Sequence, residues 1–171
     1  TDTPAFKAWF GDSKVVDENG EPLVVFHGTR EKFDVFEQGR AGAMYFSPDR
    51  NYSSSYGPKV GSYYLKIDKL ADLTNPETDE YKLAVKTFNE RGGWSENEDA
   101  MEGRTSPDFD PALDETWEMF DNPDTYIEEV FFQQGYDGFK LNENGTVSYA
   151  VFEPTQIKSV DNRGTFDSND P

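Results

Sequence analysis

The strongest constraint on the fold is a β-hairpin near the carboxyl end of the chain. Residues 136–141 and 146–152 are mainly apolar and flank the turn sequence Asn142-Glu143-Asn144-Gly145. Turn residues between two apolar runs are the signature of two antiparallel strands joined by a tight connection. The sheet must therefore contain antiparallel pairing.

Several shorter elements precede and follow this hairpin. Apolar runs predict strands over residues 23–26, 43–46, 62–67 and 157–160. Caps, prolines and apolar spacing predict helices over residues 4–10, 48–56, 79–90, 111–120 and 123–134. Short strands with helices spaced unevenly between them favour an α+β fold over a doubly wound parallel sheet. No glycine-rich dinucleotide or Walker loop is present.

Length and composition exclude several classes of protein. With 171 residues, we expect one domain over residues 1–160 and a polar tail or linker over 161–171. The formal charge of -18 opposes general binding to nucleic acid or anionic lipid. The absence of cysteine and the single histidine argue against a disulfide framework, thiol catalysis or a multi-histidine metal site.

An acidic insertion spans about residues 94–124, with Arg104 as its only basic residue. The favoured interpretation is a solvated surface excursion carrying the helix expected over 111–120. The alternative is a surface that recognises a basic partner.

Candidate binding and catalytic residues lie in two parts of the sequence. His27 stands at the end of an apolar strand and precedes Gly28, where a ligand could approach the backbone N–H and C=O. Tyr45 lies on the next short strand, and Ser53 and Tyr56 share one face of the helix after it. These side chains suit a flat, electron-poor ring that bears an amide. By themselves, these residues favour a structural histidine and a helix whose tyrosines pack in the core, and a ligand site is the alternative.

In this order and spacing, the motifs resemble the ADP-ribosyltransferase superfamily, in the histidine–tyrosine–glutamate branch of diphtheria-type toxins and poly-ADP-ribose polymerases. Residues 4–11, 25–29 and 152–159 are most similar to the ADP-ribosyltransferase domains of phage polyvalent proteins and related bacterial effectors. The resemblance implies a split antiparallel β-sheet core with peripheral helices, NAD as the substrate and no metal. It implies a toxin-like enzyme that transfers one ADP-ribose and releases nicotinamide.

The resemblance also implies a role for each matching residue. His27 would bond the adenosine-side ribose, and Gly28 and Ser53 would fix the carboxamide. Tyr56 would stack on the nicotinamide, and Tyr45 would pack at its other side. The full set expected to bind NAD is His27, Gly28, Tyr45, Ser53 and Tyr56, with Thr29 at the adenosine ribose and Arg40 at the pyrophosphate.

One position departs from the family pattern. Ser148 stands where the family has a glutamate, and a serine carries no negative charge. Three interpretations stay open: assistance from a carboxylate of the substrate, a replacement charge from Glu143 or Glu153, or a protein that binds NAD without turnover. Glu153 is five residues from Ser148 and would point to the opposite strand face, which favours Glu143. The expected catalytic set is His27, Tyr45, Ser148 and Glu143.

Other classes of function fit less well. A serine hydrolase built on Ser47 or Ser148 with His27 lacks a nucleophile-elbow glycine pattern. A calcium site in the aspartates of residues 108–114 lacks the glycine and bidentate glutamate of an EF-hand. The non-enzyme alternative is an acidic protein-interaction module with its aromatic residues in the core.

The expected partner is a macromolecular acceptor; a protein is favoured, and a nucleic acid stays open as the alternative. The chain shows no signal peptide or transmembrane segment, and no membrane partner is expected. We expect a monomer that acts in the cytoplasm of the producing or target cell, where NAD is found. The sequence leaves open whether the chain is a protein of its own or a domain of a larger polypeptide.

Overall fold

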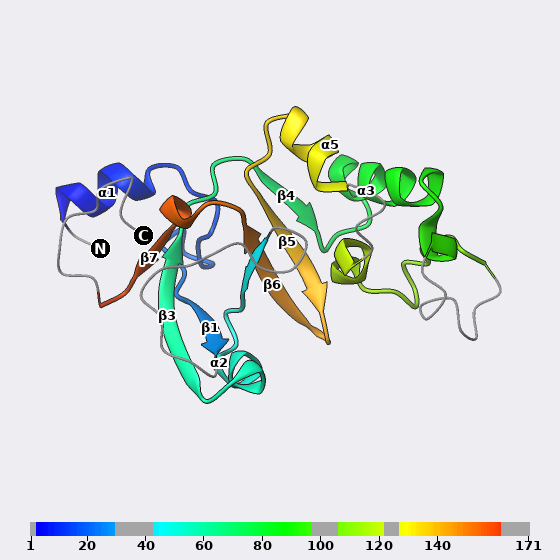
Figure 1. Cartoon of the computed structure of the whole chain (residues 1–171). Coiled ribbons are helices and arrows are strands. Elements are labelled where there is room, and N and C mark those ends of the chain that lie inside the picture. The colour runs from blue at the N-terminus through cyan, green and yellow to red at the C-terminus, as the bar shows by residue number, and fades with distance from the viewer. Residues whose placement is uncertain (1–2, 30–42, 97–105, 122–126, 162–171) are drawn as a thin grey trace.

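The computed structural model describes residues 3–29, 43–96, 106–121 and 127–161, which form an α+β fold with two β-sheets (Figure 1). The first sheet has the strand order β1 (Val25–Thr29), β3 (Lys59–Leu65), β7 (Ile157–Ser159). The second has the order β2 (Met44–Phe46), β6 (Thr146–Val151), β5 (Gly138–Glu143), β4 (Leu70–Leu73). All strand pairs are antiparallel except β4 with β5. The expectation of a split, mainly antiparallel sheet is confirmed.

Helices lie beside both sheets. They are α1 (Pro4–Phe10), α2 (Arg50–Ser53), α3 (Asp79–Glu90) and α5 (Ile127–Gln133), with short 3-10 turns η2 (Ser54–Tyr56), η3 (Gly93–Glu96), η4 (Thr116–Asp121) and η6 (Pro154–Gln156). Figure 1 shows α1 beside the three-stranded sheet, and α3 and α5 together on the side of the four-stranded sheet. In the part of the chain that the structure describes, no helix has the length and apolar character to cross a membrane.

Local capping explains the two helices whose bounds the sequence predicted. Thr3 accepts a hydrogen bond from the backbone N–H of Phe6 at 3.1 Å, and Gly11 ends α1 at φ 52°. Thr78 caps α3 in the same way, through the N–H of Tyr81. These caps satisfy N–H groups that the first turn of a helix leaves without partners.

The carboxyl-terminal hairpin also forms as expected. Asn144 and Gly145 both have positive φ, at 50° and 79°, as a two-residue type I′ turn requires. The register pairs Glu143 with Thr146 and Leu141 with Ser148. Glu143 and Ser148 therefore lie on one face of the hairpin, near its turn.

Two hydrophobic cores lie on the two faces of the second sheet. One fills the space between the sheets, with Phe46 of β2, Leu65 of β3, and Tyr149 and Val151 of β6. The larger one joins the other face to α3 and α5. Its buried members include Ala71, Leu73, Tyr81, Phe88, Ile127, Phe131, Phe139 and Leu141.

The expectation of a solvated excursion over residues 94–124 was wrong for much of the described segment. Trp94, Phe109, Met119 and Phe120 are buried in the larger core, at most 5% exposed. The helix expected over 111–120 is instead a turn followed by η4. The Asp110 and Asp114 side chains accept backbone N–H groups and hold the turn, as aspartate does where it competes with a helix.

Two other expectations needed adjustment, and one strand was missed. The helix expected over 48–56 begins at Arg50, because Asp49 caps it, and tightens into η2 from Ser54. The helix expected over 123–134 is described as Ile127–Gln133, and residues 123–126 lie outside the described residues. β4 was not predicted, because four residues give little periodicity and its partner β5 is distant in sequence.

A glycine at position 28 allows α2 to pack against β1. A Cβ atom built there would lie 1.8 Å from the backbone oxygen of Ser53. We predict that Gly28→Ala lowers the free energy of unfolding by about 3 kcal/mol, because the helix backbone must move. Urea denaturation measures this change.

Gly20→Ala is the control, because nothing lies within 4 Å of its added Cβ and only its φ of +78° is unfavourable. The free energy of unfolding of that variant should fall by only about 1 kcal/mol. Equal losses in the two variants would contradict close packing of α2 on β1.

Candidate functional site

His27 is held at the junction of the two sheets. Phe26 exchanges both backbone hydrogen bonds with Ser47, at 2.7 and 3.0 Å, which brings the end of β2 beside β1. The Nδ1 atom of His27 then lies 2.8 Å from the carbonyl oxygen of Tyr45. Since a carbonyl can only accept, Nδ1 carries the hydrogen and Nε2 is an acceptor in the neutral ring. Burial lowers the pKa of His27, which favours this neutral form at pH 7.

Gly28 presents its backbone toward the second sheet. In an antiparallel strand the N–H and C=O of one residue point to the same side, and the side alternates along the chain. Because Phe26 directs both groups to Ser47, Gly28 directs its own groups away from β3 as well. An amide donor and acceptor thus face the side on which His27 meets Tyr45.

Ser53 has a structural contact in this arrangement. Its hydroxyl donates to the carbonyl of Phe26 at 3.1 Å, and its side chain is 3% exposed. The hydrogen is used by β1 rather than offered to a ligand, so the contact with a carboxamide stays a prediction. For Thr29 only the strand backbone is described, and Arg40 lies outside the described residues.

A buried carboxylate lies beside Ser148, the position at which this chain differs from the family pattern. Glu143, at the end of β5, is 1% exposed. Its Oε1 accepts the Ser148 hydroxyl at 2.6 Å, and its Oε2 accepts the Tyr56 hydroxyl at 2.9 Å. Charge-assisted bonds of this length compensate the desolvation of a carboxylate. The structure thus brings together Glu143, Ser148 and Tyr56, and places a negative charge beside the serine.

A chain of hydroxyl groups extends from this carboxylate. The Tyr56 hydrogen goes to Glu143, so Tyr52 is the donor across the 2.8 Å between the two tyrosine oxygens. The Asn144 side chain donates to the Tyr52 oxygen at 3.0 Å. The pKa of Tyr56 is raised, first by desolvation and then by its bonds to Tyr52 and Glu143. Tyr56 therefore stays a neutral donor, although 48% of its side chain is exposed.

Tyr45 shares a sheet face with Ser148. Tyr45 of β2 pairs with Ala150 of β6, two residues from Ser148, so their side chains leave the sheet on the same side. Tyr52 was missed in the sequence, although it stands one helical turn before Tyr56, at a spacing that favours contact.

Glu153 does not join this site. It follows the far end of β6, is exposed, and caps η6 through the backbone of Gln156. Among the described residues, no group of three or more His, Cys, Asp or Glu side chains is arranged to hold a metal ion.

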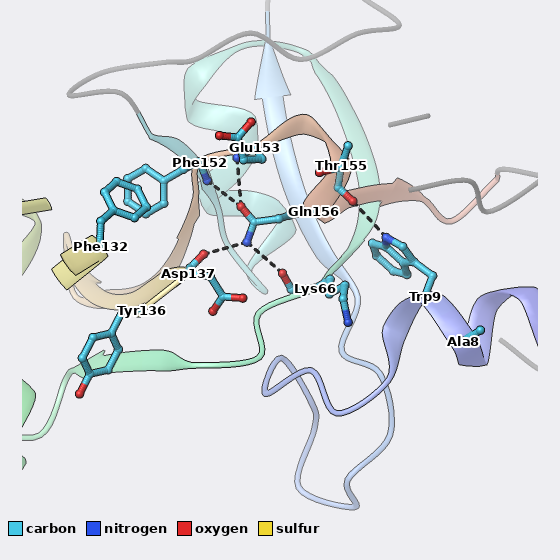
Figure 2. Close-up of a pocket in the computed structure, with 10 residues that line it drawn as sticks. All are labelled: Ala8, Trp9, Lys66, Phe132, Tyr136, Asp137, Phe152, Glu153, Thr155 and Gln156. Carbon is cyan, nitrogen blue, oxygen red and sulfur yellow. Dashed lines mark hydrogen bonds between the residues drawn. The ribbon is translucent and has the colours of Figure 1, made fainter. Parts of the chain in front are cut away.

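A cavity of about 440 Å³ lies at the opposite end of the β5–β6 hairpin (Figure 2). It is lined by Trp9, Phe132 and Phe152, among others, and its wall includes Gln156. The Gln156 amide accepts the N–H groups of Phe152 and Glu153 and donates to two backbone carbonyls. It therefore joins backbone segments rather than offering groups to a ligand. Six strand residues, roughly 20 Å, separate this cavity from Glu143.

A split, mainly antiparallel sheet with peripheral helices is consistent with an ADP-ribosyltransferase-like fold. The family model described as ADP-Ribosyltransferase in polyvalent proteins matches residues 17–166. The chain therefore belongs to this family, as the sequence resemblance indicated.

Other comparisons add little. No curated protein matches the chain. A solved structure described as an anti-CRISPR protein is similar at 12% identity and a TM-score of 0.46, over 81% of this chain and 95% of that chain. Similarity at this level carries no argument about function.

The burial of His27 predicts a pH-dependent stability. Its pKa lies below 6.5 in the folded state, so the unfolded state binds more protons as the pH falls through that value. The free energy of unfolding should then decrease by up to about 1.4 kcal/mol per pH unit until the lowered pKa is passed.

Urea denaturation of the wild type and of His27→Asn between pH 7.5 and pH 5 isolates this contribution, since the carboxylates are common to both proteins. The free energy of unfolding of the wild type should exceed that of the variant by less and less as the pH falls. A difference in free energy of unfolding that does not change with pH would contradict a buried neutral histidine.

Proposed function

We propose that this domain is an NAD-dependent mono-ADP-ribosyltransferase that modifies a protein acceptor and releases nicotinamide. The observation that carries the proposal is the carboxylate of Glu143, within 2.6 Å of the Ser148 hydroxyl. The family pattern calls for a negative charge at the position of Ser148, and Glu143 supplies one from across the hairpin.

The proposed reaction breaks the bond between the ribose carbon and the nicotinamide nitrogen. The bonding electron pair leaves with the nitrogen, so nicotinamide departs as a neutral molecule and positive charge develops on the ribose. A fixed carboxylate in a site of low dielectric stabilises that charge. A nucleophilic group of the acceptor forms the new bond to the ribose carbon and releases its proton to solvent water.

The other residues of the site would hold NAD. The backbone N–H and C=O of Gly28 match the two halves of a carboxamide, which is an acceptor and a donor. The exposed ring of Tyr56 offers a surface for a flat nicotinamide. With Nδ1 of His27 bonded to Tyr45, its Nε2 can accept a ribose hydroxyl. Tyr45 would pack at the other side of the ring.

A protein acceptor fits the charge of the chain better than a nucleic acid. At -18, the domain would repel a phosphate backbone, and it would attract a basic protein segment. Because NAD is found in the cytoplasm, we expect the reaction to take place there.

The second candidate function is NAD binding without turnover. It is favoured by the two protein hydrogen bonds that already occupy the oxygens of Glu143. A carboxylate held for structural reasons alone would have the same contacts.

Glu143→Gln separates the two functions. We predict that the variant still binds NAD but releases nicotinamide at least about 100-fold more slowly, because an amide cannot stabilise the developing positive charge. NAD at 100 times its dissociation constant should stabilise both proteins by about 2.7 kcal/mol, which a thermal-shift titration measures. Nicotinamide release is followed by chromatography.

Tyr56→Ala and Asp108→Asn complete the comparison. Tyr56→Ala should lose the stabilisation by NAD. Asp108→Asn removes an exposed carboxylate of the acidic insertion over residues 94–124, called the acidic segment below, and should behave as the wild type. Wild-type stabilisation without nicotinamide release would favour the second candidate. No stabilisation by NAD would reject both.

A further inference from the structure

The turn that carries Glu143 is held by a second carboxylate. Oε1 of Glu115 accepts the backbone N–H of Asn144, and Oε2 accepts that of Gly145, each at 2.8 Å. Both N–H groups belong to the two central residues of the type I′ turn. These residues lie beyond the last strand pair, Glu143 with Thr146, so the pairing of β5 with β6 does not use their N–H groups. One carboxylate thus binds two successive amides, an arrangement that suits an anion.

A neighbouring contact reinforces this one. The Thr116 hydroxyl, fully buried, accepts the N–H of Asn142 at 3.0 Å. Glu115 and Thr116 therefore hold the backbone on both sides of Glu143. The indole N–H of Trp117 also lies 3.4 Å from Oε1 of Glu115. These three residues come from the acidic segment and stand at the start of η4, which packs against β5.

On the other side, the turn meets the tyrosine chain. The Asn144 side chain donates to Tyr52, which donates to Tyr56, the partner of Glu143. A displacement of the turn would consequently change both the position of the Glu143 carboxylate and the position of the Tyr56 ring.

We propose that Glu115 is a positioning residue, which fixes the hairpin turn so that Glu143 stays beside Ser148 and Tyr56. The proposal rests on the proposed function for its catalytic consequence. Its structural part, the restraint of Asn144 and Gly145 and through them of Glu143, does not depend on turnover. It gives the acidic segment a role at the site: its carboxylate replaces the water that would otherwise solvate the turn.

The first experiment is nuclear magnetic resonance on the wild type, Glu115→Gln and Glu115→Ala. Amide hydrogen exchange at Asn144 and Gly145 should be at least about 10-fold faster in Glu115→Ala, with Glu115→Gln between, since its single amide oxygen retains one acceptor. The carboxyl carbon signal of Glu143 should shift in Glu115→Ala. Asp108→Asn, which removes a charge from the same segment, should change neither.

The second experiment measures nicotinamide release. Glu115→Ala should lower kcat about 10- to 100-fold and raise KM for NAD by a smaller factor, less than about 10-fold, because the Glu143 carboxylate is displaced directly and the Tyr56 ring only through Tyr52, while the NAD-binding backbone of β1 stays in place. Glu115→Gln should recover part of the rate. A variant that had only lost stability would instead show a normal kcat once the fraction of unfolded protein is corrected for.

The outcomes distinguish the two proposals. Unchanged amide exchange and an unchanged Glu143 signal in Glu115→Ala would overturn the positioning role, whatever the activity. Faster exchange with a normal kcat, in a protein that Glu143→Gln inactivates, would overturn it as well. If the wild type releases no nicotinamide, the proposed function fails, and the exchange and carboxyl measurements alone decide whether Glu115 positions Glu143.

Discussion

A carboxylate that is 1% exposed needs hydrogen-bond donors, because its desolvation otherwise costs several kcal/mol. At Glu143 the donors come from two other elements, Ser148 on β6 and Tyr56 on η2. The first contact requires the register of the β5–β6 hairpin, and the second requires α2 and η2 to pack closely on β1 at Gly28. The satisfaction of one buried charge thus links the two sheets at the candidate site.

The acidic segment shows a second use of carboxylates. Acidic residues usually lie on a solvated surface, yet the described part of this segment buries aromatic side chains and directs its carboxylates to N–H groups. Asp114 accepts the N–H of Asp110 and lies 3.3 Å from the indole nitrogen of Trp94, and Glu115 accepts two amides of the hairpin turn. These acidic residues replace water at backbone groups that would otherwise lose solvation on folding.

Sequence patterns predicted the elements whose causes are local. The caps of α1 and α3 and the Asn-Gly turn depend on neighbours within four residues, so their bounds followed from the chain itself. β4 and η4 did not follow, because β4 pairs with a strand some 68 positions away and η4 is fixed by packing on β5. Ser53 shows the limit at the site: its spacing places it on the same helix face as Tyr56, but the bond of its hydroxyl to the carbonyl of Phe26 depends on tertiary packing.

The sequence by itself determined the antiparallel hairpin, the family and the candidate residues His27, Tyr45, Tyr56 and Ser148. It left open whether any carboxylate takes the place of the motif glutamate. Only the tertiary structure decided which one lies beside Ser148, since the bond from Tyr56 to Glu143 joins residues 87 positions apart. Likewise, the bond from Gly145 to Glu115 spans 30 positions. Contacts of such separation depend on strand register and helix packing, which no local pattern encodes.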